Sequence, residues 1–293
     1  CIRDRSLEKQ KAKARQNWSG TGSKATDKIW FDILSNTTPT DFLGYEEESG
    51  AAIIQSIVVK DKIVNTISVN DEAVLILNQT TFYGESGGQI GDTGIISTDD
   101  CIFEVTDTKK KLGLHLHYGK VKKGNMKNGD SVTLEINISK RNSLRSYHTA
   151  THLLHQSLRD TLGDHVTQKG SLVSHDRLRF DFSHHKQISK EEVDKIESIV
   201  DNKIAQNYPV WTQSMKPEDA IKMGALALFG EKYGDEVRVI FIGADNNDAY
   251  SIELCGGTHV KQTGEIGKFK IISNTTLAAG KRSIDPIRDT DVD

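Results

Sequence analysis

Cysteine is scarce in this sequence. It occurs only at Cys1, Cys101 and Cys255, and no two of these residues form a CxxC pair. An odd number of widely separated cysteines argues against a disulfide framework and is typical of a reducing compartment. We therefore expect a cytoplasmic protein.

Long apolar runs are also absent. No stretch approaches the roughly 18 residues that a membrane-spanning helix needs. Residues 1–16 are charged throughout and lack the apolar centre of a signal peptide. The sequence therefore predicts no membrane association. Because the chain starts at Cys1, directly in a charged helical segment, we also expect it to be a fragment of a longer protein.

The signature of a nucleotide-binding P-loop is missing as well. The glycine-dense segment 82–94, FYGESGGQIGDTG, does not end in GK[ST], and no helix is predicted directly after it. Nucleotide binding is not expected here. The glycines instead predict tight turns or a close approach of the backbone to another element.

The small net charge of -3 hides two segments of opposite charge. Residues 40–107 contain two basic and thirteen acidic side chains (2 − 13 = −11), and residues 108–186 contain fifteen basic and six acidic ones (15 − 6 = +9). Such runs are usually solvated faces of neighbouring domains. The basic segment includes His148 and His152, so it could also steer a polyanion toward them.

The pattern along the chain predicts an α+β protein of about two domains. Short β-rich runs between Phe42 and Ile138 predict a small antiparallel β-barrel. A helix from Lys140 to Gly163 then opens a second domain, in which an antiparallel sheet is packed by helices; one helix follows the capping box of Ser189 and Glu192. The predicted organisation is a helical linker over 1–39, the barrel over 40–139, the second domain over 140–285 and a tail over 286–293.

Two histidine-containing pairs, far apart in the sequence, predict a metal centre. His148 and His152 are four residues apart on a predicted helix, so both imidazoles point to one place. Cys255 and His259 repeat the spacing, and Gly256 and Gly257 between them favour a tight turn. An isolated pair of histidines with this spacing is more often two partly exposed residues on a helix than a metal site. Three imidazoles and one thiolate, however, suit tetrahedral zinc.

The motifs in their order resemble the editing domain of alanyl-tRNA synthetases. HTATH at 148–152, TQKGS at 167–171, RFDF at 179–182 and CGGTH at 255–259 carry the likeness, which covers about residues 15–284. Threonyl-tRNA synthetase and AlaX editing domains share the ligand pairs, whereas FYGESGGQIGDTG favours the alanyl type. Thr149 stands where an HExxH metalloprotease has its glutamate, so proteolysis is disfavoured.

The resemblance implies hydrolysis of the ester that joins serine or glycine to the 3′ end of tRNA(Ala), with one zinc ion and no use of ATP by this fragment. Serine is larger than alanine, so a size filter cannot reject alanine; a buried polar group must recognise the serine hydroxyl. Gln168 is the first candidate for that group, Thr167 the second, and Thr151 a further one.

Several alternatives stay open at this stage. Four protein ligands are typical of a closed structural zinc site, so a non-catalytic tRNA-binding module is one alternative, and a threonyl-type domain acting on Ser-tRNA(Thr) is another. His155 is interpreted as a helix-surface residue, with a role as base or orienting group as the alternative. The oligomeric state and the group that activates water are not predicted. Candidates for phosphate contacts to the tRNA acceptor stem are Arg141, Arg145, Lys169 and Arg177.

Overall fold

The structure is a computed structural model that describes residues 24–226, 234–246 and 248–288. It divides into two compact units. Unit 1 contains residues up to 85 together with 91–138, and unit 2 contains residues 86–90 together with the chain from 139 onward. Residues 1–23 of the helical linker predicted over 1–39 lie outside the described residues. Among the described helices, none has the length and apolar character needed to cross a membrane.

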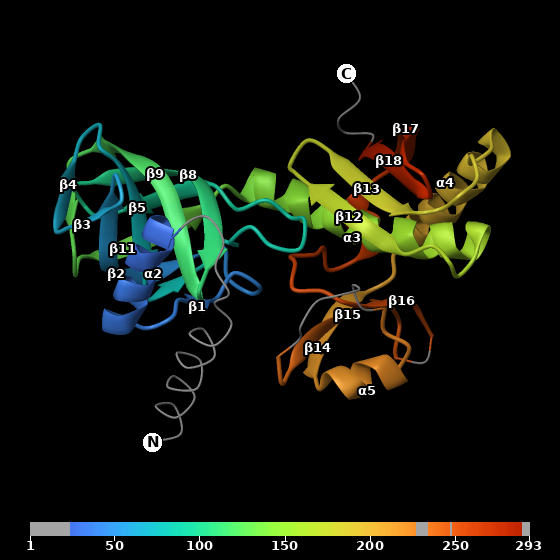
Figure 1. The fold of residues 1–293 in the computed structure, drawn as a ribbon, viewed down its shortest axis with the longest axis horizontal. Coiled ribbons are helices and arrows are strands. Elements are labelled where there is room, and N and C mark those ends of the chain that lie inside the picture. Colours follow the sequence, from blue (N-terminus) through green and yellow to red (C-terminus); the bar gives the residue numbers. More distant parts are fainter. Residues whose placement is uncertain (1–23, 227–233, 247, 289–293) are drawn as a thin grey trace. The chain divides into compact units, whose positions relative to one another are not determined.

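Unit 1 is a closed antiparallel barrel, as the β-rich runs predict (Figure 1). In β11 (Ser131–Ile136) exposed and buried residues alternate, so Val132, Leu134 and Ile136 fill the interior. This strand pairs with β7 on one side and with β2 on the other, which closes the sheet on itself. The barrel strands follow the order β11, β7 (Gly94–Ser97), β8 (Ile102–Lys111), β9 (Leu114–Lys123), β5 (Glu72–Leu77) and β2 (Ser49–Val59).

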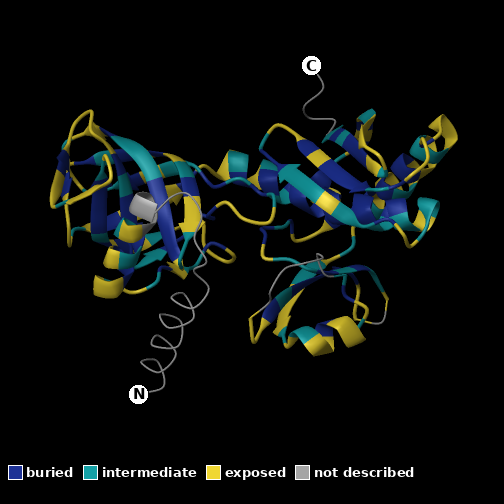
Figure 2. Cartoon of the chain, in the orientation of Figure 1, coloured by how far each residue is buried: buried dark blue, intermediate teal, exposed yellow. Residues whose placement is uncertain are grey.

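Within the described residues, unit 1 is completed by one helix and five short strands. Helix α2 (Lys24–Asn36), predicted as part of a helical linker, packs Trp30, Ile33 and Leu34 into a cluster with barrel side chains. Exposed residues gather mainly in the turns between barrel strands (Figure 2). The short strands are β1 (Asp41–Phe42), β3 (Lys62–Val64), β4 (Thr66–Ser68), β6 (Gln79–Thr80) and β10 (Asn125–Lys127).

Unit 2 is built on an antiparallel sheet packed by helices, which confirms the predicted α+β class. Helix α3 (Ile138–Leu162) and helix α4 (Lys190–Ala205) share one apolar core with the sheet. The predicted capping box is present at the start of α4, with Ser189 and Glu192 bonded reciprocally. The sheet has the order β12 (Gln168–Val173), β13 (Leu178–Ser183), β18 (Lys281–Arg288) and β17 (Phe269–Ala278).

A second, three-stranded sheet leads into the region of Cys255. Strand β15 (Val237–Gly243) is central, and β14 (Val210–Met215) and β16 (Ala249–Leu254) pair with it antiparallel. Helix α5 (Pro217–Lys222) buries Ala220 in the core of this sheet and leaves its other side exposed (Figure 2). A short helix η1 (Thr263–Ile266) follows the turn that carries His259.

The structure contains several strands that were not predicted. They are β1, β6, β7, β10, β14 and β18; β7 is only four residues long, and β14 has three exposed polar residues between partly buried ends. Residues 286–288, predicted to start a tail, instead end β18, where Pro286 lies opposite Ile271 and Ile287 opposite Lys270. Residues 86–90, predicted within the barrel domain, belong to unit 2 through their contacts with β12.

Candidate metal centre

Helix α3 supplies the first two side chains of the centre. His148 and His152 lie one turn apart on its buried face, with exposed fractions of 4% and 5%. Their rings are nearly parallel, 14° apart, with 5.4 Å between centroids. The four-residue spacing thus places two imidazoles beside each other inside the unit.

The turn after β16 supplies the other two side chains. Arg238 holds this turn, since its Nη1 donates hydrogen bonds to the carbonyl oxygens of Cys255 (3.2 Å) and Gly257 (2.8 Å). A Cβ at position 257 would lie 2.0 Å from Cε1 of His148. Only glycine therefore lets the turn approach α3 closely enough, in agreement with the tight turn predicted for CGGTH.

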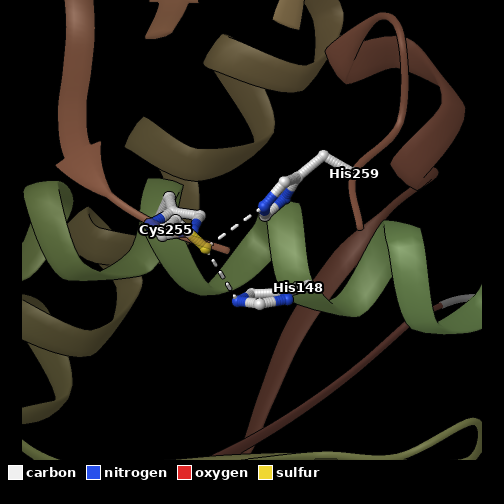
Figure 3. Close-up of side chains that lie close together, drawn as sticks. His148, Cys255 and His259 are labelled. Atoms are coloured by element: carbon white, nitrogen blue, oxygen red, sulfur yellow. Dashed lines mark hydrogen bonds between the residues drawn. The ribbon is translucent and has the colours of Figure 1, made fainter. Parts of the chain in front are cut away.

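The four side chains converge on one point, and Figure 3 shows three of them, His148, Cys255 and His259. Sγ of Cys255 lies 3.4 Å from Nε2 of His148 and 3.3 Å from Nε2 of His259. One ligand atom from each of these residues and from His152 lies within 4.8 Å of the others. Nε2 of His152 is buried and has no hydrogen-bond partner among the described residues.

This geometry fits a zinc ion. Tetrahedral zinc with one sulfur and one nitrogen ligand would separate those two atoms by about 3.6 Å, close to the distances around Cys255. Three neutral imidazoles and one thiolate are a ligand set that zinc prefers. The buried, unpartnered Nε2 of His152 is the kind of group that a metal ion would satisfy.

A second layer of side chains fixes the orientation of each imidazole. Nδ1 of His148 lies 2.7 Å from Oε1 of Gln89, and Nδ1 of His152 lies 2.9 Å from Oε2 of Glu253. Nδ1 of His259 lies 3.3 Å from Oγ1 of Thr149. The Thr149 hydroxyl donates to the carbonyl of Arg145, so it meets His259 with a lone pair. Gln89 and Thr149 act as acceptors, so Nδ1 of His148 and of His259 carries the hydrogen and Nε2 of each ring is free to bind a metal. The Glu253 carboxylate lies within ion-pair distance of Nδ1 of His152 and favours the hydrogen on that atom as well.

The electrostatics of the cluster favour a thiolate. Burial opposes ionisation of Cys255, but the adjacent His148 and His259 outweigh it and lower the pKa of the thiol well below its usual value. Burial lowers the pKa of His259 to about 3, so its ring is neutral at physiological pH. Burial also disfavours a charged His152, yet the Glu253 carboxylate prevails and raises its pKa to about 10. A metal ion that binds Nε2 of His152 must therefore displace a proton from this ring.

Sequence reasoning missed Gln89 and Glu253 as parts of this centre. Gln89 comes from the glycine-dense segment and lies 59 residues from His148 in the chain. Glu253 is also not marked by the local pattern. In β16 the polar Ser251 and Glu253 alternate with the apolar Ile252 and Leu254, which predicts an exposed carboxylate, whereas the structure buries Ser251 and Glu253.

Two further candidates, His155 and Thr151, lie on α3. His155, interpreted as a helix-surface residue, is only 5% exposed. Its Nδ1 lies 3.1 Å from Oε1 of Glu253 and its ring packs against Phe180, because the helix is buried on that side as well. The hydroxyl of Thr151 donates to the carbonyl of Tyr147 in its own helix.

The two candidates for serine recognition lie at the start of β12. Gln168 Nε2 donates to Oγ of Ser171 at 3.1 Å, and Thr167 Oγ1 lies 2.8 Å from Oγ of Ser183. Both side chains are partly buried. Within the described part of the chain, neither forms a hydrogen bond with one of the four converging residues.

The candidates for phosphate contacts divide by burial. Arg141 is fully buried, with 0% exposed surface, so its guanidinium is not offered at the surface and the prediction of a phosphate contact is wrong for this residue. Arg145 is partly buried and donates to Oδ1 of Asn142. Lys169 and Arg177 are exposed.

Two parts of the chain match known protein families. Residues 3–140 match the family described as tRNA synthetases class II (A). Residues 237–285 match the Threonyl and Alanyl tRNA synthetase second additional domain, and this range includes Cys255 and His259.

Two similar proteins cover nearly the whole chain. The alanine–tRNA ligase of Mesorhizobium japonicum is 50% identical over 287 residues, which are 96% of this chain and 32% of that protein. The alanine–tRNA ligase of Parvibaculum lavamentivorans is 51% identical over 289 residues, 97% of this chain and 32% of that protein. The chain thus spans about a third of the length of these relatives.

Proposed function

Because the chain belongs to the alanine–tRNA ligase family, we propose that its metal centre proofreads tRNA(Ala). The proposed reaction is hydrolysis of the ester bond in mischarged Ser-tRNA(Ala) and Gly-tRNA(Ala). The observation that carries the proposal is the convergence of His148, His152, Cys255 and His259, two of which lie in the segment matched by the second additional domain. Such a reaction needs no ATP from this part of the chain.

One zinc ion is the cofactor that we propose for these four residues. When bound there, zinc would supply a Lewis acid that polarises a water molecule or the ester carbonyl. The chain contributes the orientation of the ligands. Gln89 and Thr149 accept hydrogen bonds from Nδ1 of His148 and His259, and the Glu253 carboxylate lies 2.9 Å from Nδ1 of His152. The Nε2 atoms therefore need no rearrangement to bind the metal.

Serine recognition is assigned to the start of β12, with Gln168 first and Thr167 second. A site that hydrogen-bonds the serine hydroxyl leaves a polar group unpaired when alanine enters, which costs roughly 1–3 kcal/mol. Both side chains already form hydrogen bonds with serine hydroxyls of the protein, Gln168 with Ser171 and Thr167 with Ser183. They can therefore replace these bonds with a hydrogen bond to the hydroxyl of the substrate.

The partner is the acceptor end of tRNA(Ala) carrying serine or glycine. The exposed side chains of Lys169 and Arg177, and the partly buried Arg145, are available for phosphate contacts. Such contacts would hold the acceptor stem without reading its sequence. The basic character of residues 108–186 supports attraction of the polyanion.

Deacylation assays test the proposal directly. We expect the zinc-loaded chain to release serine from Ser-tRNA(Ala) much faster than buffer does, and to leave Ala-tRNA(Ala) largely intact. The Cys255→Ala variant, which lacks the thiolate ligand, should lose the activity. A wild-type chain that binds zinc but leaves Ser-tRNA(Ala) as stable as buffer does would overturn the proposal.

The count of four protein ligands favours a second candidate, a non-catalytic zinc-stabilised tRNA-binding module, since closed four-ligand sites are usually structural. The two functions separate in a Gln168→Ala variant that retains zinc and fold. Loss of serine release in that variant supports an editing site and excludes the structural module. Assays with Ser-tRNA(Thr) beside Ser-tRNA(Ala) test the threonyl-type alternative, which predicts preference for Ser-tRNA(Thr).

A further inference from the structure

The glycine-dense segment brings a short piece of chain against the edge of β12. Gly88 accepts a hydrogen bond from the Val173 N–H (2.7 Å), and the N–H of Ile90 donates to the Val173 carbonyl (3.1 Å). Gly88 has φ of +86°, and a Cβ on it would lie 2.2 Å from Oγ of Ser171. A side chain is therefore excluded at this position by both conformation and space. The glycines allow the close approach that fixes the residue after them.

That residue is Gln89, which is completely buried. Its Oε1 lies 2.7 Å from Nδ1 of His148 and 3.0 Å from the backbone nitrogen of Thr258, and its Nε2 lies 2.9 Å from Oγ1 of Thr258. A backbone N–H can only donate, so the Thr258 contact identifies the oxygen of the amide and fixes its orientation. The oxygen can then only accept from His148.

These contacts determine how His148 can bind a metal. With the hydrogen on Nδ1, the lone pair of the ring is on Nε2, which points to Sγ of Cys255 at 3.4 Å. The same amide oxygen also binds the backbone between Cys255 and His259. Gln89 therefore joins a ligand on α3 to the turn that carries two more ligands.

We propose that Gln89 is a positioning residue of the metal centre, which holds His148 in the Nδ1–H tautomer and fixes its distance from the Cys255–His259 turn. The inference rests on the proposed function only in that the centre binds a metal. It does not depend on the reaction that the loaded centre performs. A buried amide in this place gives the imidazole a neutral acceptor, whereas His152 has the carboxylate of Glu253.

Three variants of the full chain test the proposal. Gln89→Met keeps the length of the side chain but has no acceptor for the imidazole. Gln89→Glu keeps an acceptor for His148 and for the Thr258 N–H, and the Thr258 hydroxyl can turn to donate to it. Gln213→Met makes the same chemical change at an exposed position of β14 and serves as the control.

We expect the zinc affinity of Gln89→Met to fall about 10–100-fold, as is typical when a partner of a metal ligand is lost. Gln89→Glu and Gln213→Met should stay within about threefold of the wild type by the same measure. Affinity is measured by competition with a chromophoric chelator. The absorption spectrum of the cobalt-loaded chain reports the ligand geometry, which should change only in Gln89→Met. Wild-type affinity and an unchanged cobalt spectrum in Gln89→Met would overturn the proposal.

A second measurement uses only the wild-type chain, so it does not depend on whether a variant folds. In the zinc-loaded wild-type chain with ¹⁵N-labelled histidine, nuclear magnetic resonance should show His148 with its hydrogen on Nδ1 and the metal on Nε2. The opposite tautomer would overturn the proposal. A chain that shows this tautomer and the loss in Gln89→Met, but does not hydrolyse Ser-tRNA(Ala), would overturn the proposed function and leave the role of Gln89 standing.

Discussion

Glu253 on β16 holds its carboxylate oxygen Oε2 2.9 Å from Nδ1 of His152 on α3. Its other oxygen lies 3.1 Å from Nδ1 of His155. Burial disfavours the ionised carboxylate, but the two imidazoles outweigh that effect and lower the pKa of Glu253. One buried acid thus fixes two rings of the same helix and ties them to the strand that leads into Cys255.

Replacing Glu253 with glutamine should weaken metal binding. The amide has the shape of the carboxylate but only one oxygen, so one of the two imidazoles loses its acceptor. We expect a fall in zinc affinity of about 10–100-fold, measured by competition with a chelator. Glu236→Gln, at an exposed position just before β15, is the matched control. Equal affinity in Glu253→Gln and the control would show that the carboxylate does not orient His152.

Gly257→Ala should disrupt the centre by a steric effect. The added methyl group would lie 2.0 Å from Cε1 and 2.2 Å from Nδ1 of His148, so the turn or the imidazole must move. We expect zinc affinity to fall by at least about tenfold, on the same scale as the loss of a partner of a metal ligand, and the cobalt spectrum to change. Gly234→Ala adds a methyl group where only one atom of the described residues lies within 4 Å, at 3.8 Å, and should have no effect. A normal cobalt spectrum in Gly257→Ala would contradict this geometry.

The barrel of unit 1 should lose stability when the pH falls. Burial lowers the pKa of His117 to about 4 and that of His115 to about 3. The unfolded chain takes up protons near pH 6.5, whereas the folded barrel resists them until about pH 4. The contribution of the two neutral histidines to the free energy of unfolding is therefore fully present well above pH 6.5 and is lost as the pH falls toward 4. At pH 5 the loss is about 2 kcal/mol for each histidine.

Urea unfolding at pH 7, 6 and 5 checks this dependence. Trp30 is buried in unit 1, so a chain with Trp18→Phe and Trp211→Phe reports the barrel by fluorescence. In His117→Gln the decline between pH 7 and 5 should be smaller by about 2 kcal/mol, because one of the two shifted groups is gone. His185→Gln, at an exposed position, should leave the decline unchanged. The same slope in His117→Gln as in the wild type would contradict the assignment.

Zinc should stabilise unit 2 selectively. All four converging residues belong to that unit, and a ligand that binds only the folded state adds about 2.7 kcal/mol at a concentration of 100 times its dissociation constant. Trp211, which stacks on Phe241 in the three-stranded sheet, reports this unit. Adding zinc should raise the urea midpoint seen by Trp211 and leave the midpoint seen by Trp30 unchanged. A shift of the Trp30 transition alone would contradict the location of the metal centre.

Local patterns predicted most elements of the fold because their physical causes lie within a few residues. The capping box of Ser189 and Glu192 is formed by groups three residues apart, and it starts α4 as predicted. Strand β7, by contrast, has only four residues and its pairing partners lie elsewhere in the chain. Such a strand exists because the barrel around it exists, which a local pattern does not contain.

The sequence by itself determined the ligand types of the candidate centre. The spacing of His148 and His152 decides their common face, since residues four apart on a helix must point the same way. Which side chains contact the Nδ1 atoms of these two imidazoles was decided by the tertiary structure alone. Gln89 contacts His148 and Glu253 contacts His152, and both come from segments far away in the chain. Only the packed fold brings these oxygens next to the Nδ1 atoms. It also decided that Arg141 is buried, because a charged residue on a helix shows its exposure only once the neighbouring elements are in place.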